Sequence, residues 1–226
     1  MLTQLAPVTW LASYPRSGNT LLRIILNHCF GQFSQSIYDD NEFSDPVVSG
    51  LVGNEPVGRD PLAFINRAAR ADRKLFVKTH EAPGGDAHPA IYIVRDGRAA
   101  AVSHAHFLRE VIGIKAELRD VITGKFSMSW SEHVKTWALS GRPNTLVVRF
   151  EDLAAAQPKT LQAIAAFIGR PLSREFDVSF ARLHARSPAF FRRGSDRENI
   201  AEMNREELDL FHGLHGDVLR QMGYGA

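Results

Sequence analysis

Cysteine and excess charge of either sign are what this sequence has least of. Cys29 is the only cysteine among 226 residues, so the chain can form no internal disulfide and no cluster of thiolate metal ligands. It falls in an apolar helical pattern with Leu26 and Phe30, which predicts a small buried residue. Lys and Arg total 27 against 25 Asp and Glu, and the resulting formal charge of +2 argues against a general nucleic-acid binder.

Long apolar runs are missing as well. No stretch approaches the roughly 18 residues that a membrane-spanning helix needs, and residues 1–10 lack the basic start and apolar centre of a secretory signal. We therefore expect a cytoplasmic protein without a membrane span. The length suits one sizeable domain, so residues 1–226 are predicted to form a single domain. An oligomer interface and a solvated helix face look alike here, and the sequence predicts no oligomeric state.

Short apolar runs alternate with longer helical patterns, which predicts an α/β fold with a central, mostly parallel sheet of four to five strands flanked by helices. Strands are expected at 8–13, 75–79, 90–94 and 145–150. Helices are expected after Thr20, after Asp60-Pro61, over 129–139, after Gln157-Pro158 and after Asn204, which forms a capping box with Glu207. Residues 31–59 and 187–199 are predicted loops.

The turn that joins the first strand to the first helix is the clearest local signal for anion binding. A helix N-terminus offers unpaired backbone N–H groups and a partial positive charge. Gly18 lets an anion approach the backbone, Ser17 and Thr20 supply hydroxyl groups, and Arg16 adds a permanent charge. No Lys follows Gly18, so the turn is not a nucleoside-triphosphate P-loop. The competing interpretation is an ordinary strand–helix turn that carries an arginine by chance.

Basic side chains also follow the next two predicted strands. Lys78 and His80 stand at the end of the second strand, Arg95 directly follows the third, and Ser103 comes eight residues later. Because ligands of parallel sheets bind outside the carboxyl ends of the strands, we expect these side chains to share one crevice with Arg16. A late basic loop adds Arg192, Arg193 and Gly194.

Taken in order, these segments resemble the cytosolic-type sulfotransferases, which use 3′-phosphoadenosine 5′-phosphosulfate (PAPS). Tyr14–Thr20 resembles the family's 5′-phosphosulfate loop, Val77–His80 its catalytic-histidine segment and Val94–Ser103 its 3′-phosphate segment. Phe150–Leu153 resembles its YEDL stretch, and Phe191–Gly194 resembles its late RKG loop. Together they span most of the chain. The resemblance implies the three-layer, P-loop-NTPase-like form of the α/β fold.

The resemblance also implies roles for individual residues. PAPS would be the co-substrate, no metal would be needed, and the acceptor would be a hydroxyl or amine of a small molecule or glycan. His80 would be the general base, while Lys78 and Arg16 would stabilise the leaving phosphate. The implied nucleotide-binding residues are Arg16, Ser17, Gly18, Asn19, Thr20, Arg95, Ser103, Phe150, Arg192, Arg193 and Gly194.

The sequence departs from the family pattern at several of these positions. Arg16 replaces the usual Lys, Asn19 replaces a Thr, and Phe150 replaces a Tyr. Leu21 stands where the family often has a Trp that stacks on the adenine, so we expect a looser or apolar adenine contact. The spacing from Gly194 to the residues that follow is shorter, which predicts a differently shaped closing loop.

Two other functions fit part of the pattern. A nucleotide kinase would need a Lys after Gly18 and an acid that holds Mg²⁺, for which Asp96 and Asp152 are available. A non-catalytic module that binds adenosine bisphosphate would not need Lys78 or His80, and both are present.

The remaining expectations concern aromatic and histidine side chains outside the motifs. In the first predicted loop, the aromatic residues Phe33, Tyr38 and Phe43 are predicted to line the acceptor pocket or its lid. We expect packing or surface roles, not metal binding, for the pairs His104–His106 and His212–His215, and core positions for Trp130 and Trp137.

Overall fold

A five-stranded parallel sheet forms the centre of the computed structural model, which describes residues 8–38, 46–57, 60–71, 73–188, 191–192 and 195–225. The strand order is β2-β3-β1-β4-β5, and every neighbouring pair is parallel. Their bounds are β1 (Val8–Ser13), β2 (Gln35–Ser36), β3 (Leu75–Thr79), β4 (Ala90–Val94) and β5 (Thr145–Arg149). The predicted α/β class is therefore confirmed, with a sheet that is parallel throughout.

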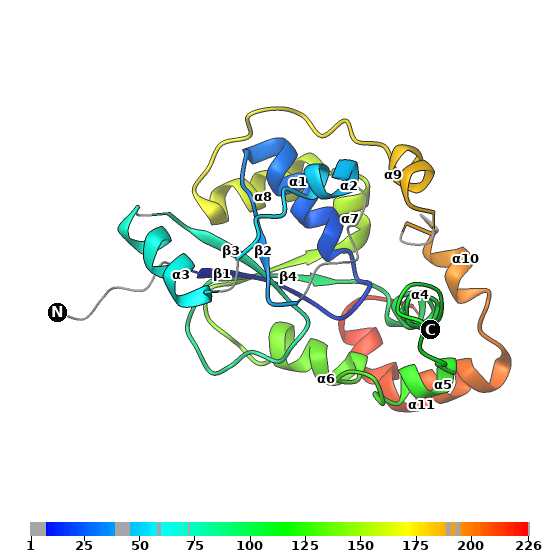
Figure 1. The fold of residues 1–226 in the computed structure, drawn as a ribbon. Helices are drawn as coiled ribbons and strands as arrows, with labels where there is room; N and C mark the ends of the chain where they lie inside the picture. The colour runs from blue at the N-terminus through cyan, green and yellow to red at the C-terminus, as the bar shows by residue number, and fades with distance from the viewer. Residues whose placement is uncertain are drawn as a thin grey trace.

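Helices cover both faces of this sheet, as Figure 1 shows. They are α1 (Asn19–Phe30), α2 (Pro46–Val52), α3 (Pro61–Arg70), α4 (Gly97–Glu110), α5 (Leu118–Ile122), α6 (Trp130–Val134), α7 (Phe150–Ala154), α8 (Pro158–Ile168), α9 (Phe180–Arg186), α10 (Asp196–Ile200) and α11 (Arg205–Gln221), and a π-helical turn (Lys135–Leu139) continues α6. Asp60 caps α3 by accepting a hydrogen bond from the amide of Ala63 at 2.9 Å, and the Asn204–Glu207 capping box begins α11. Both predicted helix starts are confirmed.

The side chains of β4 show how the two layers of helices hold the sheet. Ile91 and Ile93 pack with α1 and α8 on one face, while Tyr92 and Val94 pack with α4, α6 and α11 on the other. Successive residues of a strand point to opposite faces, so a strand covered on both sides must be apolar throughout. That is why the continuous run at 90–94 was recognisable as a strand.

Three aromatic or small side chains that the sequence places in the core are buried there. Trp130 and Trp137 pack in the α4–α6–α11 layer, and Cys29 packs in the α1–α8 layer. These predictions are confirmed.

The predicted loops hold more regular structure than expected. Residues 31–59 contain β2 and α2, residues 187–199 contain the start of α10, and α5 and α9 were not predicted. The helix α2 begins at Pro46 and is rich in valine and glycine, which favour helices weakly. It forms because Val48 and Val52 bury their side chains against Ile24 of α1. The last strand ends at Arg149, one residue earlier than predicted.

Candidate active site

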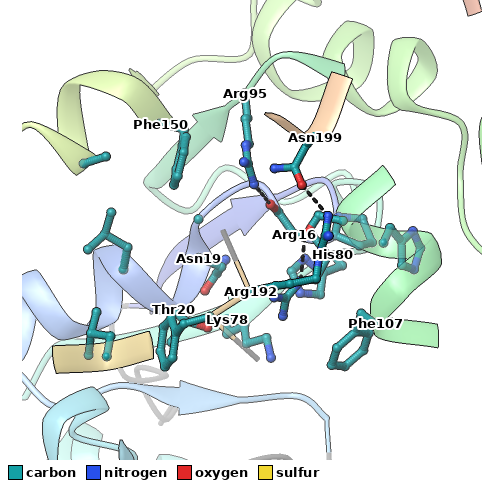
Figure 2. A pocket seen from close by; sticks show the side chains of 18 of the residues that line it. Arg16, Asn19, Thr20, Lys78, His80, Arg95, Phe107, Phe150, Arg192 and Asn199 are labelled. Carbon is teal, nitrogen blue, oxygen red and sulfur yellow. Dashed lines mark hydrogen bonds between the residues drawn. The ribbon is translucent and has the colours of Figure 1, made fainter. Parts of the chain in front are cut away.

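The carboxyl ends of the strands open into a cavity of about 580 Å³, seen from close by in Figure 2. Side chains from widely separated segments line it, as the sequence predicted for the crevice. From the predicted set, the lining holds Arg16, Gly18, Asn19, Thr20, Tyr38, Lys78, His80, Arg95, Ser103, Phe150 and Arg192. Arg193, Gly194 and Phe43 lie outside the described residues.

The turn before α1 has a backbone that only a residue without a side chain adopts easily. Gly18 caps α1 with φ of +105°, and a Cβ atom added there would lie 2.5 Å from Cδ2 of Phe150. Arg16 also has a positive φ, +63°. The side-chain amide nitrogen Nδ2 of Asn19 donates to the backbone carbonyl of Leu11 at 2.7 Å, which ties the start of the helix to β1. The turn is thus held in one shape, with bare backbone facing Phe150.

Two polar atoms of this turn are buried without a hydrogen-bond partner in the described part of the chain. They are the hydroxyl oxygen of Ser17 and the side-chain oxygen of Asn19. Buried polar groups are nearly always hydrogen-bonded, and an exception is a common sign of an absent ligand or water. Ser17 does not line the cavity directly, whereas Asn19 does.

Arg95, which follows β4, is 5% exposed and every nitrogen of its guanidinium has a partner. Nε donates to Oδ1 of Asp196 at 2.8 Å, Nη2 pairs with the same carboxylate, and Nη1 donates to the carbonyl of Arg16 at 2.9 Å. The guanidinium carbon lies 4.3 Å from the centre of the Phe150 ring. Arg95 therefore joins the Arg16 turn, α10 and the start of α7, three segments far apart in the sequence.

Arg16 points toward α4 and meets the residue that the sequence paired with the 3′-phosphate. Its Nε donates to the hydroxyl of Ser103 at 3.4 Å, and its guanidinium carbon lies 4.9 Å from the centre of the Phe107 ring.

His80 is held by contacts that determine its tautomer. Its Nδ1 lies 2.8 Å from the carbonyl oxygen of Ser13, which can only accept, so Nδ1 carries the proton and Nε2 has a free lone pair. The ring stacks on Tyr38 at a centroid distance of 5.5 Å, and the backbone amide of His80 donates to the Tyr38 hydroxyl at 2.8 Å. Burial, and then the positive charge of Lys78, lower the pKa of His80 well below its usual value. The imidazole is therefore neutral at neutral pH.

Lys78 lies on β3 and is buried. Its ammonium is 5.5 Å from the centre of the Tyr38 ring. Tyr38 donates its hydroxyl proton to Glu81 at 3.0 Å, and burial raises the pKa of Tyr38 to about 12. The phenol consequently stays protonated and links β2, β3 and the segment after it.

Arg192 reaches the cavity from the late basic segment. It donates to Glu202 at 2.8 Å and to the side-chain oxygen of Asn199. Glu202 also bonds Nε2 of His106 at 2.6 Å. Both Arg95 and Arg192 thus meet carboxylates that lie in or just after α10.

The aromatic residues predicted for the acceptor pocket separate in the structure. Tyr38 lines the cavity beside His80, but the side chain of Phe33 is 57% exposed and is not part of the lining. Phe33 lies two residues before β2, the strand that pairs with β3, and is largely exposed, so we leave it out of the site.

Sequence reasoning missed most of the apolar lining and four of its polar members. The apolar side chains include Phe107, Ile112, Phe126, Met128, Phe176 and Phe180, and the polar ones are Glu81, His104, Ser127 and Asn199. These residues come from helices and loops whose packing no local pattern reveals. Glu81 alone had a signal, because it directly follows His80.

One histidine of each pair is buried and the other is half-buried. His215 is buried and bonds the hydroxyl of Ser131 and the carbonyl of Ile122. His104 is buried and lines the cavity, and burial together with the nearby Arg16 lowers its pKa to about 4. In the described ranges, no group of three or more His, Cys, Asp or Glu side chains is placed to hold a metal ion.

Known proteins resemble this chain in sequence and in fold. The sulfotransferase domain family matches residues 6–187, which is most of the chain. The chain belongs to the sulfotransferase domain family. Human sulfotransferase 2B1 is 31% identical over 93 residues, covering 38% of this chain and 26% of that protein. The WSCD family member GA21586 of Drosophila pseudoobscura pseudoobscura is 31% identical over 183 residues, covering 73% of this chain and 51% of that protein.

The fold of this sulfotransferase-family chain also matches solved structures. Mouse sulfotransferase SULT7A1 complexed with PAP superposes with a TM-score of 0.67 at 19% identity, covering 95% of this chain and 84% of that one. At this identity the likeness concerns the fold. The chain spans between about a quarter and about half the length of the curated relatives named above, at 26% and 51%. Across the described ranges, no helix has both the length and the apolar character needed to cross a membrane.

Proposed function

We propose that this chain is a PAPS-dependent sulfotransferase that transfers the sulfuryl group to a hydroxyl or amine of an acceptor molecule. One observation carries the proposal. The anion-binding turn, the two cations Lys78 and Arg95, and a neutral histidine with a free Nε2 all line the same cavity. Membership of the sulfotransferase domain family and the PAP in the mouse structure support the choice of nucleotide.

The residues present suit an adenosine nucleotide with phosphates at both ends. The turn at Gly18 offers bare backbone at a helix N-terminus, and the buried oxygen of Asn19 lacks a partner in the described chain. Arg95, Ser103 and Arg192 would hold the 3′-phosphate, with Arg193 and Gly194 as further predicted contacts. The Phe150 ring, packed against Gly18 and Arg95, is the proposed adenine contact in place of the family Trp at Leu21.

The chemistry asks mainly for positioning and charge stabilisation. PAPS supplies an activated sulfuryl group whose leaving phosphate is weakly basic. Arg16 and Lys78 stabilise the negative charge that develops on that phosphate, assisted by the backbone amides of the turn. Because the Arg16 guanidinium cannot act as an acid, its role is purely electrostatic.

His80 acts on the acceptor. Its Nε2 has a free lone pair and takes the proton from the acceptor hydroxyl, while Nδ1 stays bonded to the Ser13 carbonyl. The lowered pKa of His80 keeps its imidazole ring in the neutral form that can accept a proton. Tyr38, bonded to the backbone amide of His80, keeps the ring in place from the opposite side.

Calorimetric titration with adenosine 3′,5′-bisphosphate in the presence of EDTA tests the nucleotide assignment. We expect metal-free binding that is at least tenfold tighter than binding of adenosine 5′-monophosphate, which lacks the 3′-phosphate. Radiolabelled sulfuryl transfer from PAPS to a panel of alcohols, phenols and amines then tests the reaction. Failure to bind the bisphosphate, combined with tight binding of ATP and Mg²⁺, would replace the proposal with a nucleotide kinase.

A further inference from the structure

Glu81 is the one acidic residue among the described residues that line the cavity. All the other charged side chains there, Arg16, Lys78, Arg95 and Arg192, are cations that suit the phosphates of the nucleotide. Glu81 directly follows His80, the proposed base, and its carboxylate bonds Tyr38, whose ring stacks on His80. A carboxylate at that place repels the nucleotide and must serve another ligand or the solvent.

The contacts of Glu81 fix its position but leave most of its hydrogen-bonding capacity unused. Its backbone amide donates to the hydroxyl of Thr79 at 3.0 Å, and its carbonyl accepts from the Trp137 indole at 2.9 Å. The carboxylate accepts one hydrogen bond, from Tyr38 at 3.0 Å. Within the described chain it forms no ion pair, although an ionised carboxylate has about four lone-pair sites.

Glu81 does not serve as an orienting partner of the base. The proton-bearing Nδ1 of His80 bonds the Ser13 carbonyl, not a carboxylate. The groups that shift the pKa of His80 are Lys78, the Ser13 carbonyl and two other histidines, and Glu81 is not among them. Its free oxygens are therefore available to an acceptor molecule.

The cavity continues past Glu81 into a second, more open hollow of about 640 Å³. Glu81 and Met128 line both spaces, and Glu132, Lys135 and Thr136 line the second one. Lys135 is the only cation among the described residues of that hollow. A ligand with its reactive group at His80 can extend past Glu81 without meeting the Arg16 and Arg95 end of the cavity.

We propose that Glu81 selects acceptors that carry a protonated amine apart from the reacting group, that is, amino alcohols and aminophenols. The ammonium group binds the Glu81 carboxylate while the hydroxyl lies at Nε2 of His80. Aromatic and apolar walls that include Phe107, Phe126 and Met128 suit an apolar spacer between the two groups. This inference rests on the proposed sulfotransferase function.

Matched acceptor pairs test the selection. 4-(2-Aminoethyl)phenol and 4-propylphenol have nearly the same shape and differ in charge, as do 6-amino-1-hexanol and 1-heptanol. Because Glu81 is exposed, wild-type protein at low ionic strength should prefer the charged member of at least one pair by about three- to fivefold in kcat/KM, the upper range of an exposed ion pair. Glu81→Gln should abolish that preference and change kcat/KM of the neutral member less than about twofold.

Glu81→Gln keeps an oxygen that can accept from Tyr38, so the variant isolates the charge. Glu117→Gln, at an exposed position away from both spaces, is the matched control and should keep the preference. Binding of adenosine 3′,5′-bisphosphate to each variant is measured alongside, and should be unchanged.

The outcomes separate this inference from the proposed function. If the bisphosphate does not bind to the wild type, the sulfotransferase proposal itself fails. If the bisphosphate binds but the wild type shows no preference for the charged acceptors, the role of Glu81 is refuted. The role is also refuted if the nucleotide-saturated wild type neither binds nor converts any charged acceptor. A preference that survives in Glu81→Gln also refutes it.

Discussion

Replacing Arg95 should weaken nucleotide binding and leave a carboxylate unneutralised at the proposed 3′-phosphate site. Arg95 is 5% exposed and pairs with Asp196, whose side chain is 20% exposed. In Arg95→Ala the Asp196 carboxylate stays beside the proposed 3′-phosphate position without its counter-ion. The variant therefore loses an attraction, and the repulsion from Asp196 is no longer offset.

The two effects have comparable size. Losing the charge-assisted hydrogen bonds of one arginine to a phosphate costs about 3 kcal/mol. Two anions that share one guanidinium lie roughly 5 Å apart, and at an effective dielectric constant of about 20 their repulsion is about 3 kcal/mol. Because Asp196 is partly exposed, screening reduces this to about 1–2 kcal/mol. The repulsion acts in both proteins, so Arg95→Ala should weaken adenosine bisphosphate binding by the lost attraction of about 3 kcal/mol, which is about 10²-fold.

A double-mutant cycle separates these contributions. Arg95→Ala combined with Asp196→Asn should recover about tenfold of the lost affinity, because the repulsion is removed while the attraction stays lost. In the presence of Arg95, Asp196→Asn should change the affinity less than about threefold, since the carboxylate both competes with the phosphate and positions the guanidinium. Isothermal calorimetry at fixed ionic strength, with thermal melting to check folding, measures all four proteins.

Arg149→Ala is the matched control. Like Arg95, Arg149 lies over an aromatic ring, that of Tyr224, and donates a hydrogen bond to a backbone carbonyl, that of Met222. Unlike Arg95, it does not line the cavity. Its loss should leave nucleotide affinity unchanged. If the double variant binds no more tightly than Arg95→Ala, the carboxylate does not act on the phosphate site and the reasoning is wrong.

Two further predictions concern the base and the turn. His80→Asn should lower kcat by about 10² to 10⁴ with bisphosphate affinity unchanged. Since only neutral His80 accepts a proton and its pKa is lowered, kcat of the wild type should stay constant on acidification until well below pH 6.5. An acid limb at or above that pH in a pH–rate profile would contradict the assignment. Gly18→Ala should weaken bisphosphate binding at least tenfold in calorimetry, because the new Cβ would lie 2.5 Å from the Phe150 ring and the residue has a φ of +105°. Unchanged binding would show that the turn does not approach the nucleotide.

The parts of the fold that could be predicted are those with an unbroken local signal. β1, β3 and β4 are apolar runs because both faces of a parallel sheet are covered, and the strand ends correctly brought Arg16, Lys78, His80 and Arg95 to one cavity. β2 has two residues, too few for any periodicity to show. The helix α2 owes its existence to packing against Ile24, which no local propensity encodes.

Besides much of the apolar lining, the acids that pair with the arginines of the site escaped prediction. Asp196 lies 101 residues from Arg95 in the sequence, in a segment predicted to be a loop, and only the folded chain shows that its carboxylate meets the guanidinium. Glu202 pairs with Arg192 in the same way. A basic motif indicates where an anion binds, but it does not indicate which protein carboxylates pair with the basic side chains when no nucleotide is bound.

These carboxylates affect how nucleotide affinity should be understood. A buried cation without a partner is costly, so Arg95 could not stay folded beside Phe150 unless an anion or several acceptors met it. Asp196 and the Arg16 carbonyl satisfy it, while Glu202 and Asn199 bond two nitrogens of Arg192 and leave its buried Nε without a partner in the described chain. Nucleotide phosphates therefore compete with interactions that already exist, and the measured affinity is the difference between the two sets. Because both acids lie in or next to α10, we infer that changes in this short segment alter nucleotide affinity without touching the turn at Gly18.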